Sequence, residues 1–581
     1  MLIRYIQDAC TRLRNDRRGS VFILFAASII PILLVMGGAV DLTRYARYKA
    51  ELANAVDAAA LALARVGQNY TEAEATTFVE DYVAALTVGG DKFTVQGFDV
   101  DKTDGGYIVA ADGAMETMFL PIGSLAKNGV GIMSMDMDIV AEVVFSSNQV
   151  ELALVFDNTG SMAFSAGSNA CGTGSDRMSG LKCAATTLVT DLMEEMNGGG
   201  GEDQLKVALV PFEGAVNTGV NTSNPPWWIE WSDEEEAEDS EQPYYTGVNF
   251  NKKNFGTSWS PDRRSIGPSW LYGKLGISWA GCVQMRAEPY DLLDTTPDAS
   301  VPNTLFVPMF WPDEPDSSAA WNNYLDDDTP DTWSWQNKQK DLDKYDKSSP
   351  SNIDWHWGKK DTTYPYSYGP NRGCPRPLTA LTADEETILD AIDDMQAQGA
   401  TGTFVPVGLA WGWHVLSPTE PFTEGIGPDD EDYEKTVKAI VLLTDGENSP
   451  SIAITSSTNK NDGTYSAFNY PATAVNLVVG SDHVYRRLQA LNLNSDPSES
   501  TAMGNLDDKT LALCSNAKDA GIRLYTITFG DLSSSTESLM EDCASTDSDG
   551  NPLYFSAPTS EELDDIFHAI GEDLSEIHLA M

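Results

Sequence analysis

From about residue 150 to the end of the chain, short apolar runs alternate with amphipathic segments. The runs predict strands at Leu152–Phe156, Lys206–Phe212, Val437–Leu443 and Ile522–Phe529. The segments between them predict helices at Met178–Met196, Leu378–Gln398, Phe404–Leu416, Asp507–Ala520 and Ser560–Leu574. Thr382 and Glu385 have the spacing of a capping box near the start of the second helix. Strands and helices in alternation predict a doubly wound α/β domain, which we place at residues 149–581.

A stretch of different character, at about residues 220–376, interrupts this alternation. It holds twelve of the chain's fourteen tryptophans and many Pro, Asn, Asp and Tyr residues. The tryptophans include Trp227, Trp228, Trp231, Trp333, Trp335, Trp355 and Trp357. They are either the core of an irregular insertion or an exposed platform for sugar or protein. We favour the core, because a loop-rich subdomain needs large apolar side chains to offset its ordering entropy.

The first predicted strand ends in a D-x-T-x-S sequence. Asp157, Thr159 and Ser161 occupy alternate positions, which project to the same side of an extended segment. Thr401 lies in a loop before a helix, and Asp445 directly follows a predicted strand. Ligands of doubly wound sheets collect at the carboxyl ends of the strands. Three hydroxyls and two carboxylates there would suit a hard cation such as Mg²⁺, although the same residue types also form ordinary turns.

The N-terminal part contains a long uncharged segment. Residues 21–40 carry no charge over twenty residues, enough to span a bilayer as a helix. A cleaved signal peptide is the rival interpretation, but the run exceeds the usual apolar region of about 7–15 residues. The arginines among residues 1–20 predict a cytoplasmic N-terminus, with everything after Asp41 outside. We therefore expect a single-pass membrane anchor.

Residues 41–148 are predicted to form a stalk helix and a small α+β domain. The helices are expected at Asp41–Val66 and Thr71–Ala85. Short strands are expected at Phe93–Val100, Tyr107–Ala111, Met118–Pro121 and Ile139–Phe145.

The charge and cysteine content narrow the classes of function. With 37 basic and 87 acidic residues, the net charge of −50 argues against nucleic acid as a partner. It fits a secreted or cell-surface protein, or simply serves solubility. Six of the seven cysteines follow the apolar segment, which suggests three disulfides, and no zinc-binding spacing is present.

The sequence offers little for catalysis. It has five histidines and neither a nucleophile elbow nor a P-loop. A metal-dependent hydrolase using Asp157, Asp445 and Glu447 is the contrasting hypothesis. We expect a protein that is not an enzyme.

The D-x-T-x-S motif, a Thr in a loop before a helix and a strand ending in TDG resemble the metal-ion-dependent adhesion site of von Willebrand factor type A domains. The resemblance implies Mg²⁺ at Asp157, Thr159, Ser161, Thr401 and Asp445, with Thr403 close to Thr401. It also implies an open coordination position for an acidic group on a partner protein. The family usually has D-x-S-x-S, and Thr159 keeps the hydroxyl.

Longer stretches resemble TadG-like proteins of the Flp (tight adherence) pilus assembly system. They are RRGSVFILFAASIIPILLVMGGAVDLTRY, AVDAAALALA, SWAGCVQMR, LFVPMFWPDEP, NRGCPRPLTALT and GLAWGWHVLSPTEPF. The resemblance implies a component of the bacterial inner membrane, with the bulk of the chain periplasmic or surface-exposed and with pilins or other assembly proteins as partners. A surface-displayed pilus adhesin is the alternative. Leu24 stands where prepilins carry Glu after the cleaved Gly, so we expect the anchor to stay uncleaved.

Three cysteine pairs follow as a hypothesis. Cys171 and Cys183 flank the loop into the first helix. Cys282 and Cys374 bracket much of the insertion, where a bond would offset loop entropy. Cys514 and Cys543 lie on either side of the strand Ile522–Phe529.

Overall fold

The computed structural model describes residues 20–579, apart from a set of shorter gaps. The gaps are residues 67–69, 87–92, 104–105, 122–131, 145–148, 170, 198–203, 221, 232–234, 238–247, 253–261, 287, 317–321, 328–341, 361, 365, 400, 431, 451–464 and 469–498. The predicted cytoplasmic segment before residue 20 and the tryptophans Trp333 and Trp335 lie outside the described residues. The chain divides into two compact units, Met1–Ser146 and Ser147–Ala580.

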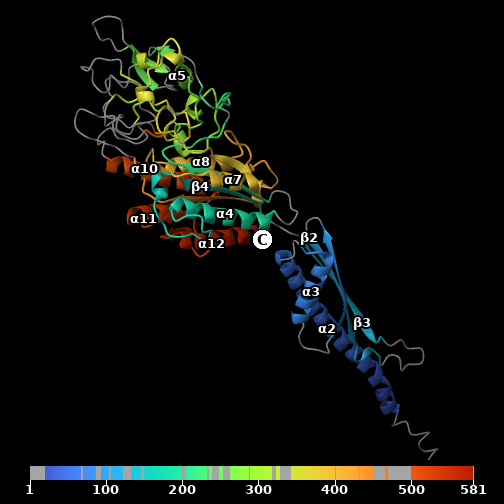
Figure 1. The fold of residues 1–581 in the computed structure, drawn as a ribbon. Helices are drawn as coiled ribbons and strands as arrows, with labels where there is room; N and C mark the ends of the chain where they lie inside the picture. Colours follow the sequence, from blue (N-terminus) through green and yellow to red (C-terminus); the bar gives the residue numbers. More distant parts are fainter. Residues whose placement is uncertain are drawn as a thin grey trace, which may run out of the picture. The chain divides into compact units, whose positions relative to one another are not determined.

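The first unit pairs two helices with a small sheet (Figure 1). Its elements are α2 (Ser20–Val66), α3 (Glu72–Leu86), β1 (Thr94–Thr103), β2 (Gly106–Glu116) and β3 (Ser134–Val144). The sheet is antiparallel with the order β1-β2-β3. Leu52 and Val56 of α2 and Val79 of α3 form a core with Tyr107 and Val109 of β2. This small α+β arrangement is the predicted one.

The segment Met118–Pro121 was expected to be a strand and is not. The backbone amides of Met118, Phe119 and Leu120 donate to the buried carboxylate of Asp41, which holds the segment in a turn.

Within the described part of the chain, no helix has the length and apolar character needed to cross a membrane. The predicted span at residues 21–40 is therefore not confirmed.

The second unit is built on a mixed six-stranded sheet with the order β12-β11-β10-β4-β5-β9. Its strands are β4 (Gln149–Asp157), β5 (Leu205–Phe212), β9 (Thr379–Thr382), β10 (Thr436–Thr444), β11 (Arg523–Phe529) and β12 (Tyr554–Ala557). All neighbours pair in parallel except β9, which pairs antiparallel with β5. The predicted α/β class with a largely parallel sheet is thus confirmed.

Helices cover both faces of this sheet (Figure 1). The helices of the unit are α4 (Arg177–Met196), α5 (Pro268–Leu275), α7 (Glu385–Asp394), α8 (Val405–Leu416), α10 (Glu499–Asp519), α11 (Ser534–Cys543) and α12 (Ser560–Leu579). One face packs Leu152, Leu154 and Phe156 of β4 against α4, α7 and α12. The other packs Ala153 and Val155 against α8 and α10. Because both faces are covered, β4 is a continuous apolar run without alternation.

The predicted helix Leu378–Gln398 is wrong in its first part. Thr379–Thr382 forms the edge strand β9, and the helix begins only at Glu385. The Thr382 hydroxyl accepts from the amide of Asp384, the N-cap residue of α7, so the predicted capping box with Glu385 does not form.

The insertion between β5 and β9 is irregular and has an aromatic core. It contains α5 and a small antiparallel sheet of β6 (Glu235–Ala237), β7 (Val248–Lys252) and β8 (Asp262–Ile266). Trp228, Trp279 and Trp311 are buried and share a core with Trp411 of α8, whereas Trp227 is exposed. For the three buried tryptophans, the prediction of a core rather than a platform is confirmed.

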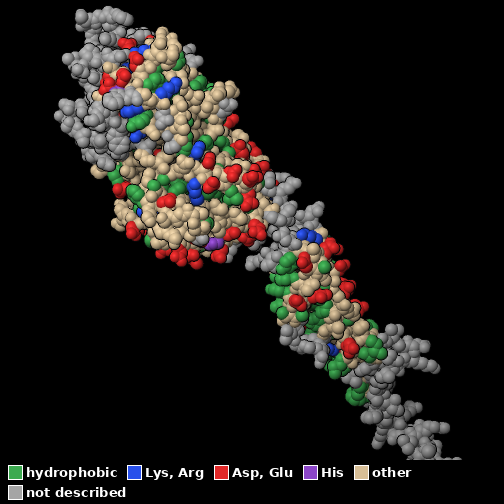
Figure 2. Space-filling model, viewed as in Figure 1, with side chains coloured by type: hydrophobic (Ala, Val, Ile, Leu, Met, Phe, Trp, Pro, Cys, Tyr) green, Lys and Arg blue, Asp and Glu red, His purple; other side chains and the backbone are tan. Residues whose placement is uncertain are grey.

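Short 3-10 helices and three disulfides complete the second unit. The 3-10 helices are Gly160–Ala163, Tyr290–Leu292, Pro302–Thr304, Leu342–Lys344, Pro350–Asn352, His356–Gly358 and Tyr433–Lys435. The disulfides join the predicted pairs Cys171–Cys183, Cys282–Cys374 and Cys514–Cys543. Acidic side chains are spread over the visible face of the unit (Figure 2), as the charge of the chain requires.

Candidate metal centre

The two predicted carboxylates come together because β4 and β10 are parallel neighbours. Asp157 is the last residue of β4, and Asp445 directly follows β10. The register pairs Phe156 with Leu443, so both strands end at the same edge of the sheet. Both carboxylate residues are buried.

The hydroxyls of the D-x-T-x-S motif join these carboxylates. Thr159 Oγ1 lies 3.0 Å from Ser161 Oγ, and Ser161 Oγ donates to Asp445 Oδ1 at 2.6 Å. Asp157 Oδ1 accepts from the Thr159 amide at 2.8 Å, and its Oδ2 accepts from the Thr444 hydroxyl at 2.8 Å. Four of the five predicted ligands therefore form one hydrogen-bonded group of oxygen-bearing side chains, which Asp157 joins through the Thr159 amide.

A close approach between two loops shapes the neighbouring backbone. A Cβ on Gly160 would lie 2.9 Å from Cα of Gly399, so a side chain there would clash with backbone. Gln398 donates its amide to the carbonyl of Asn158 at 2.8 Å, which fastens the loop before α8 to the motif.

The two threonines of the loop before α8 have different hydrogen-bond partners. Thr403 Oγ1 donates to Thr159 Oγ1 at 3.4 Å, next to the oxygen group. The Thr401 hydroxyl instead donates to Glu213 Oε2 at 3.1 Å and accepts from the Gly214 amide at 2.9 Å. The structure thus places Thr403 beside the group and Thr401 toward Glu213.

Burial makes negative charge costly at this edge of the sheet. It raises the pKa of Asp157 to about 7, with the Asp445 carboxylate adding to the effect. Burial also raises the pKa of Asp445, opposed by hydrogen bonds from Ser161 and Arg177. The Arg177 guanidinium lies 2.9 Å from Asp445 Oδ2 and supplies one positive charge. A divalent cation would supply the compensation that Asp157 lacks.

Glu213 is a further carboxylate that the sequence analysis missed. It follows β5, the neighbour of β4, and is fully buried. Burial raises its pKa well above the usual value, and its Oε1 has no hydrogen-bond partner among the described residues. The rule that found Asp157 and Asp445, an acidic residue directly after a buried strand, would also have found Glu213.

The donor set fits a hard divalent cation. Every side chain in the group offers oxygen, the donor type that Mg²⁺ favours. Both polar side-chain atoms of Asn158 are buried without a hydrogen-bond partner among the described residues, like Glu213 Oε1. Buried polar atoms without partners are uncommon and fit an edge where an ion or its water ligands would bind.

The histidines of the described chain are not part of this group. His414 is buried in α8, where Nδ1 lies 2.8 Å from Asp294 Oδ1 and Nε2 lies 3.4 Å from an Arg286 nitrogen. Its position within the aromatic core is that of a packed residue.

Sheet order and oxygen group together define an α/β domain with a candidate cation centre at the carboxyl edge of its sheet. Residues 19–65 match the family described as Putative Flp pilus-assembly TadE/G-like, so the predicted resemblance is confirmed for this N-terminal segment. No curated protein matches the chain.

Solved structures with some likeness include three pilus proteins. The PilB minor pilin from Streptococcus sanguinis is 12% identical, with 83% of this chain and 78% of that chain covered and a TM-score of 0.29. The pilus adhesin SpaC from Lactobacillus rhamnosus GG is 12% identical over 84% of this chain and 35% of that chain, with a TM-score of 0.28. The vWF domain of the type V pili tip protein Mfa5 from Porphyromonas gingivalis is 10% identical over 74% and 95%, with a TM-score of 0.28. These scores are too low to carry an argument, so the fold assignment rests on the strand order above.

Proposed function

We propose that the chain is an envelope-exposed component of Flp pilus assembly, anchored in the inner membrane through residues 21–40. Its second unit would be a von Willebrand factor type A-like domain that binds a partner protein through Mg²⁺. The TadE/G-like match of residues 19–65 supports the pilus assignment. The proposal gives the chain no catalytic role.

One observation carries the binding part of the proposal. Ser161 and Asp445, 284 residues apart in the sequence, meet at 2.6 Å between the ends of β4 and β10. The cation would be held by Asp157, Thr159, Ser161 and Asp445, with Thr403 beside them. A carboxylate of a pilin or another assembly protein would complete its coordination. Binding would then depend both on Mg²⁺ and on that carboxylate.

A pull-down from envelope extracts tests this function. The full chain is used as bait with Mg²⁺ or with chelator, as wild type and as Asp157→Ala. We expect a partner that is retained only by the wild type and only with Mg²⁺. Asp549→Ala, which removes an exposed carboxylate in a distant turn, is the matched control and should bind like wild type.

Three outcomes would count against the proposal. Retention of the same partner in chelator would mean that no cation bridges the two proteins. Recovery of the chain in the soluble fraction after cell lysis would contradict the anchor, while labelling on intact cells would indicate display at the surface instead of a role in assembly.

A further inference from the structure

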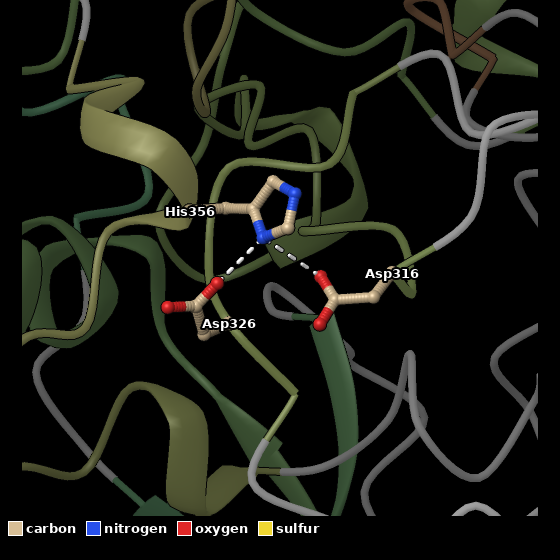
Figure 3. A group of neighbouring side chains, drawn as sticks. All are labelled: Asp316, Asp326 and His356. Atoms are coloured by element: carbon tan, nitrogen blue, oxygen red, sulfur yellow. Dashed lines mark hydrogen bonds and ion pairs between the residues drawn. The ribbon is translucent and has the colours of Figure 1, made fainter.

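A second cluster of side chains of the types that can ligate a metal lies in the insertion, outside the oxygen group at the ends of β4 and β10. It consists of Asp316, Asp326 and His356 (Figure 3). His356 Nδ1 lies 3.1 Å from Asp316 Oδ1 and 2.5 Å from Asp326 Oδ1. One ligand atom from each of the three residues lies within 4.8 Å of the other two. Figure 3 shows both carboxylates directed toward the same ring nitrogen, from two different directions.

Backbone hydrogen bonds hold two of the three residues in place. Leu325 and Trp355 form an antiparallel bridge between their segments. The Asp326 amide donates to Asp354 O at 2.9 Å, and the His356 amide donates to Tyr324 O at 2.9 Å. The side chains of Asp326 and His356 therefore project from a fixed pair of segments.

The third residue, Asp316, is oriented by its own set of contacts. Its amide donates to Asp327 Oδ2 at 2.8 Å, and the Asp327 amide donates back to Asp316 Oδ2 at 3.1 Å. The Asn323 side-chain amide donates to Asp316 Oδ1 at 3.1 Å. Such outer contacts are what fix the ligands of a metal site.

Within the described part of the chain, the carboxylates of Asp316 and Asp326 are ion-paired with His356 and with no lysine or arginine. A single imidazole N–H cannot fully satisfy two carboxylates that converge on one nitrogen. Among the described residues, Lys344 contacts Asp313 and Asp327, Lys359 donates to the Asn323 carbonyl, and neither is paired with Asp316 or Asp326. A divalent cation at the convergence point would offset both carboxylates and use the ring nitrogen as a ligand.

An independent observation also points to a ligand. Asn323 is only 4% exposed, and its Oδ1 has no hydrogen-bond partner among the described residues. This oxygen belongs to the same amide group whose nitrogen contacts Asp316, so it lies next to the group. Burying an amide oxygen costs free energy unless a hydrogen-bond donor or a cation interacts with its lone pairs.

We propose that Asp316, Asp326 and His356 bind Zn²⁺, with Asn323 Oδ1 as an adjacent oxygen donor. An imidazole nitrogen with carboxylate oxygens suits Zn²⁺ in four-coordinate geometry, whereas Mg²⁺ and Ca²⁺ prefer oxygen alone. The ion would join the three segments around residues 316, 326 and 356, which have little regular secondary structure. It would stabilise the insertion independently of the centre at the sheet edge.

Zn²⁺ stoichiometry measured by calorimetry and elemental analysis tests this site. The full-length chain carries Asp157→Ala in every sample, so that Zn²⁺ at the sheet-edge centre does not contribute. Adding His356→Gln should remove an equivalent of bound Zn²⁺. Adding His568→Gln instead is the matched control, because His568 is half-exposed on α12 and its Nδ1 lies 3.8 Å from Asp191 Oδ2, farther than either carboxylate contact of His356. Unchanged stoichiometry in the His356→Gln chain would overturn the proposal.

Because the His356→Gln chain could lose Zn²⁺ through misfolding, a second measurement uses the unmutated chain. Histidine modification by diethyl pyrocarbonate is followed residue by residue with mass spectrometry, with and without Zn²⁺. Zn²⁺ should protect His356 and leave His568 reactive. Equal labelling of His356 under both conditions would also overturn the site.

Discussion

At the scale of single residues, the loop before α8 offers two hydroxyls with different partners: Thr401 donates to Glu213, and Thr403 donates to Thr159. Thr401 and Thr403 occupy alternate positions in G-A-T-G-T, so either hydroxyl could have faced the motif. Thr401 faces Glu213 because the buried carboxylate of Glu213 needs a hydrogen-bond donor, which the Thr401 hydroxyl supplies. That contact joins residues 188 apart, so no local pattern reveals it. Asp157, Thr159, Ser161 and Asp445 were predictable because they follow directly from two apolar strands.

Alanine variants of the two threonines should separate their roles. Thr403→Ala should weaken Mg²⁺ binding by about ten-fold, the lower end of effects seen for groups supporting a metal site. Thr401→Ala should leave Mg²⁺ affinity closer to wild type but lower the free energy of unfolding by about 1–3 kcal/mol, since Glu213 loses its donor. Calorimetric titration with Mg²⁺ and urea unfolding measure the two effects. A larger loss of affinity in Thr401→Ala would restore the original assignment.

The buried carboxylates predict how stability depends on pH without metal. The pKa of Asp157 is raised from 3.8 to about 7, so over that range the folded chain binds more protons than the unfolded chain. This residue should therefore lower the free energy of unfolding as pH rises from about 4 to about 7. Asp157→Asn should remove this part of the slope, and Mg²⁺ should stabilise the wild type more at about pH 8 than at about pH 5. Urea unfolding of both chains across this range, with and without Mg²⁺, measures the difference; identical slopes would contradict it.

At the scale of secondary structure, the buried strands were predictable and the edge segments were not. β4, β5, β10 and β11 have apolar runs because helices cover both faces of the sheet. β9 is a four-residue edge strand, too short for a periodic signal, so its residues merged with α7 in the prediction. The turn at Met118–Pro121 depends on the distant carboxylate of Asp41, which a local pattern cannot show.

The disulfides close loops of different lengths, so removing them should lower the free energy of unfolding by different amounts. Cys282–Cys374 closes a separation of 92 residues in the irregular insertion, whereas Cys171–Cys183 closes 12. In the chain-entropy account, removing the longer link should cost about 4–5 kcal/mol and the shorter about 3 kcal/mol. Paired Cys→Ser variants of each disulfide, compared by urea unfolding, measure this order. A greater loss from the shorter link would show that loop entropy does not govern stability here.

At the scale of the whole molecule, each apolar core of the described residues lies within one of the two units. The core around Leu52 and Tyr107 contains residues of the first unit only. The two cores on either side of the large sheet, and all three disulfides, lie within the second unit. The oxygen group at the ends of β4 and β10 also lies there, because β4 begins at Gln149. Each described residue named above for the candidate centre belongs to the second unit.

Residues 147–580 expressed alone in an oxidising compartment should therefore fold and respond to Mg²⁺ like the full chain. The physical reason is that a unit with its own buried cores and its own cross-links does not need the other unit to offset its conformational entropy. Urea midpoints of the isolated unit and of the full chain, each with and without Mg²⁺, compare the two. Asp157→Ala in the isolated unit is the control, since it should remove the Mg²⁺ effect and keep the fold. If the isolated unit unfolds earlier or loses its response to Mg²⁺, the first unit contributes to the centre, and the division of cores does not describe the stability of the chain.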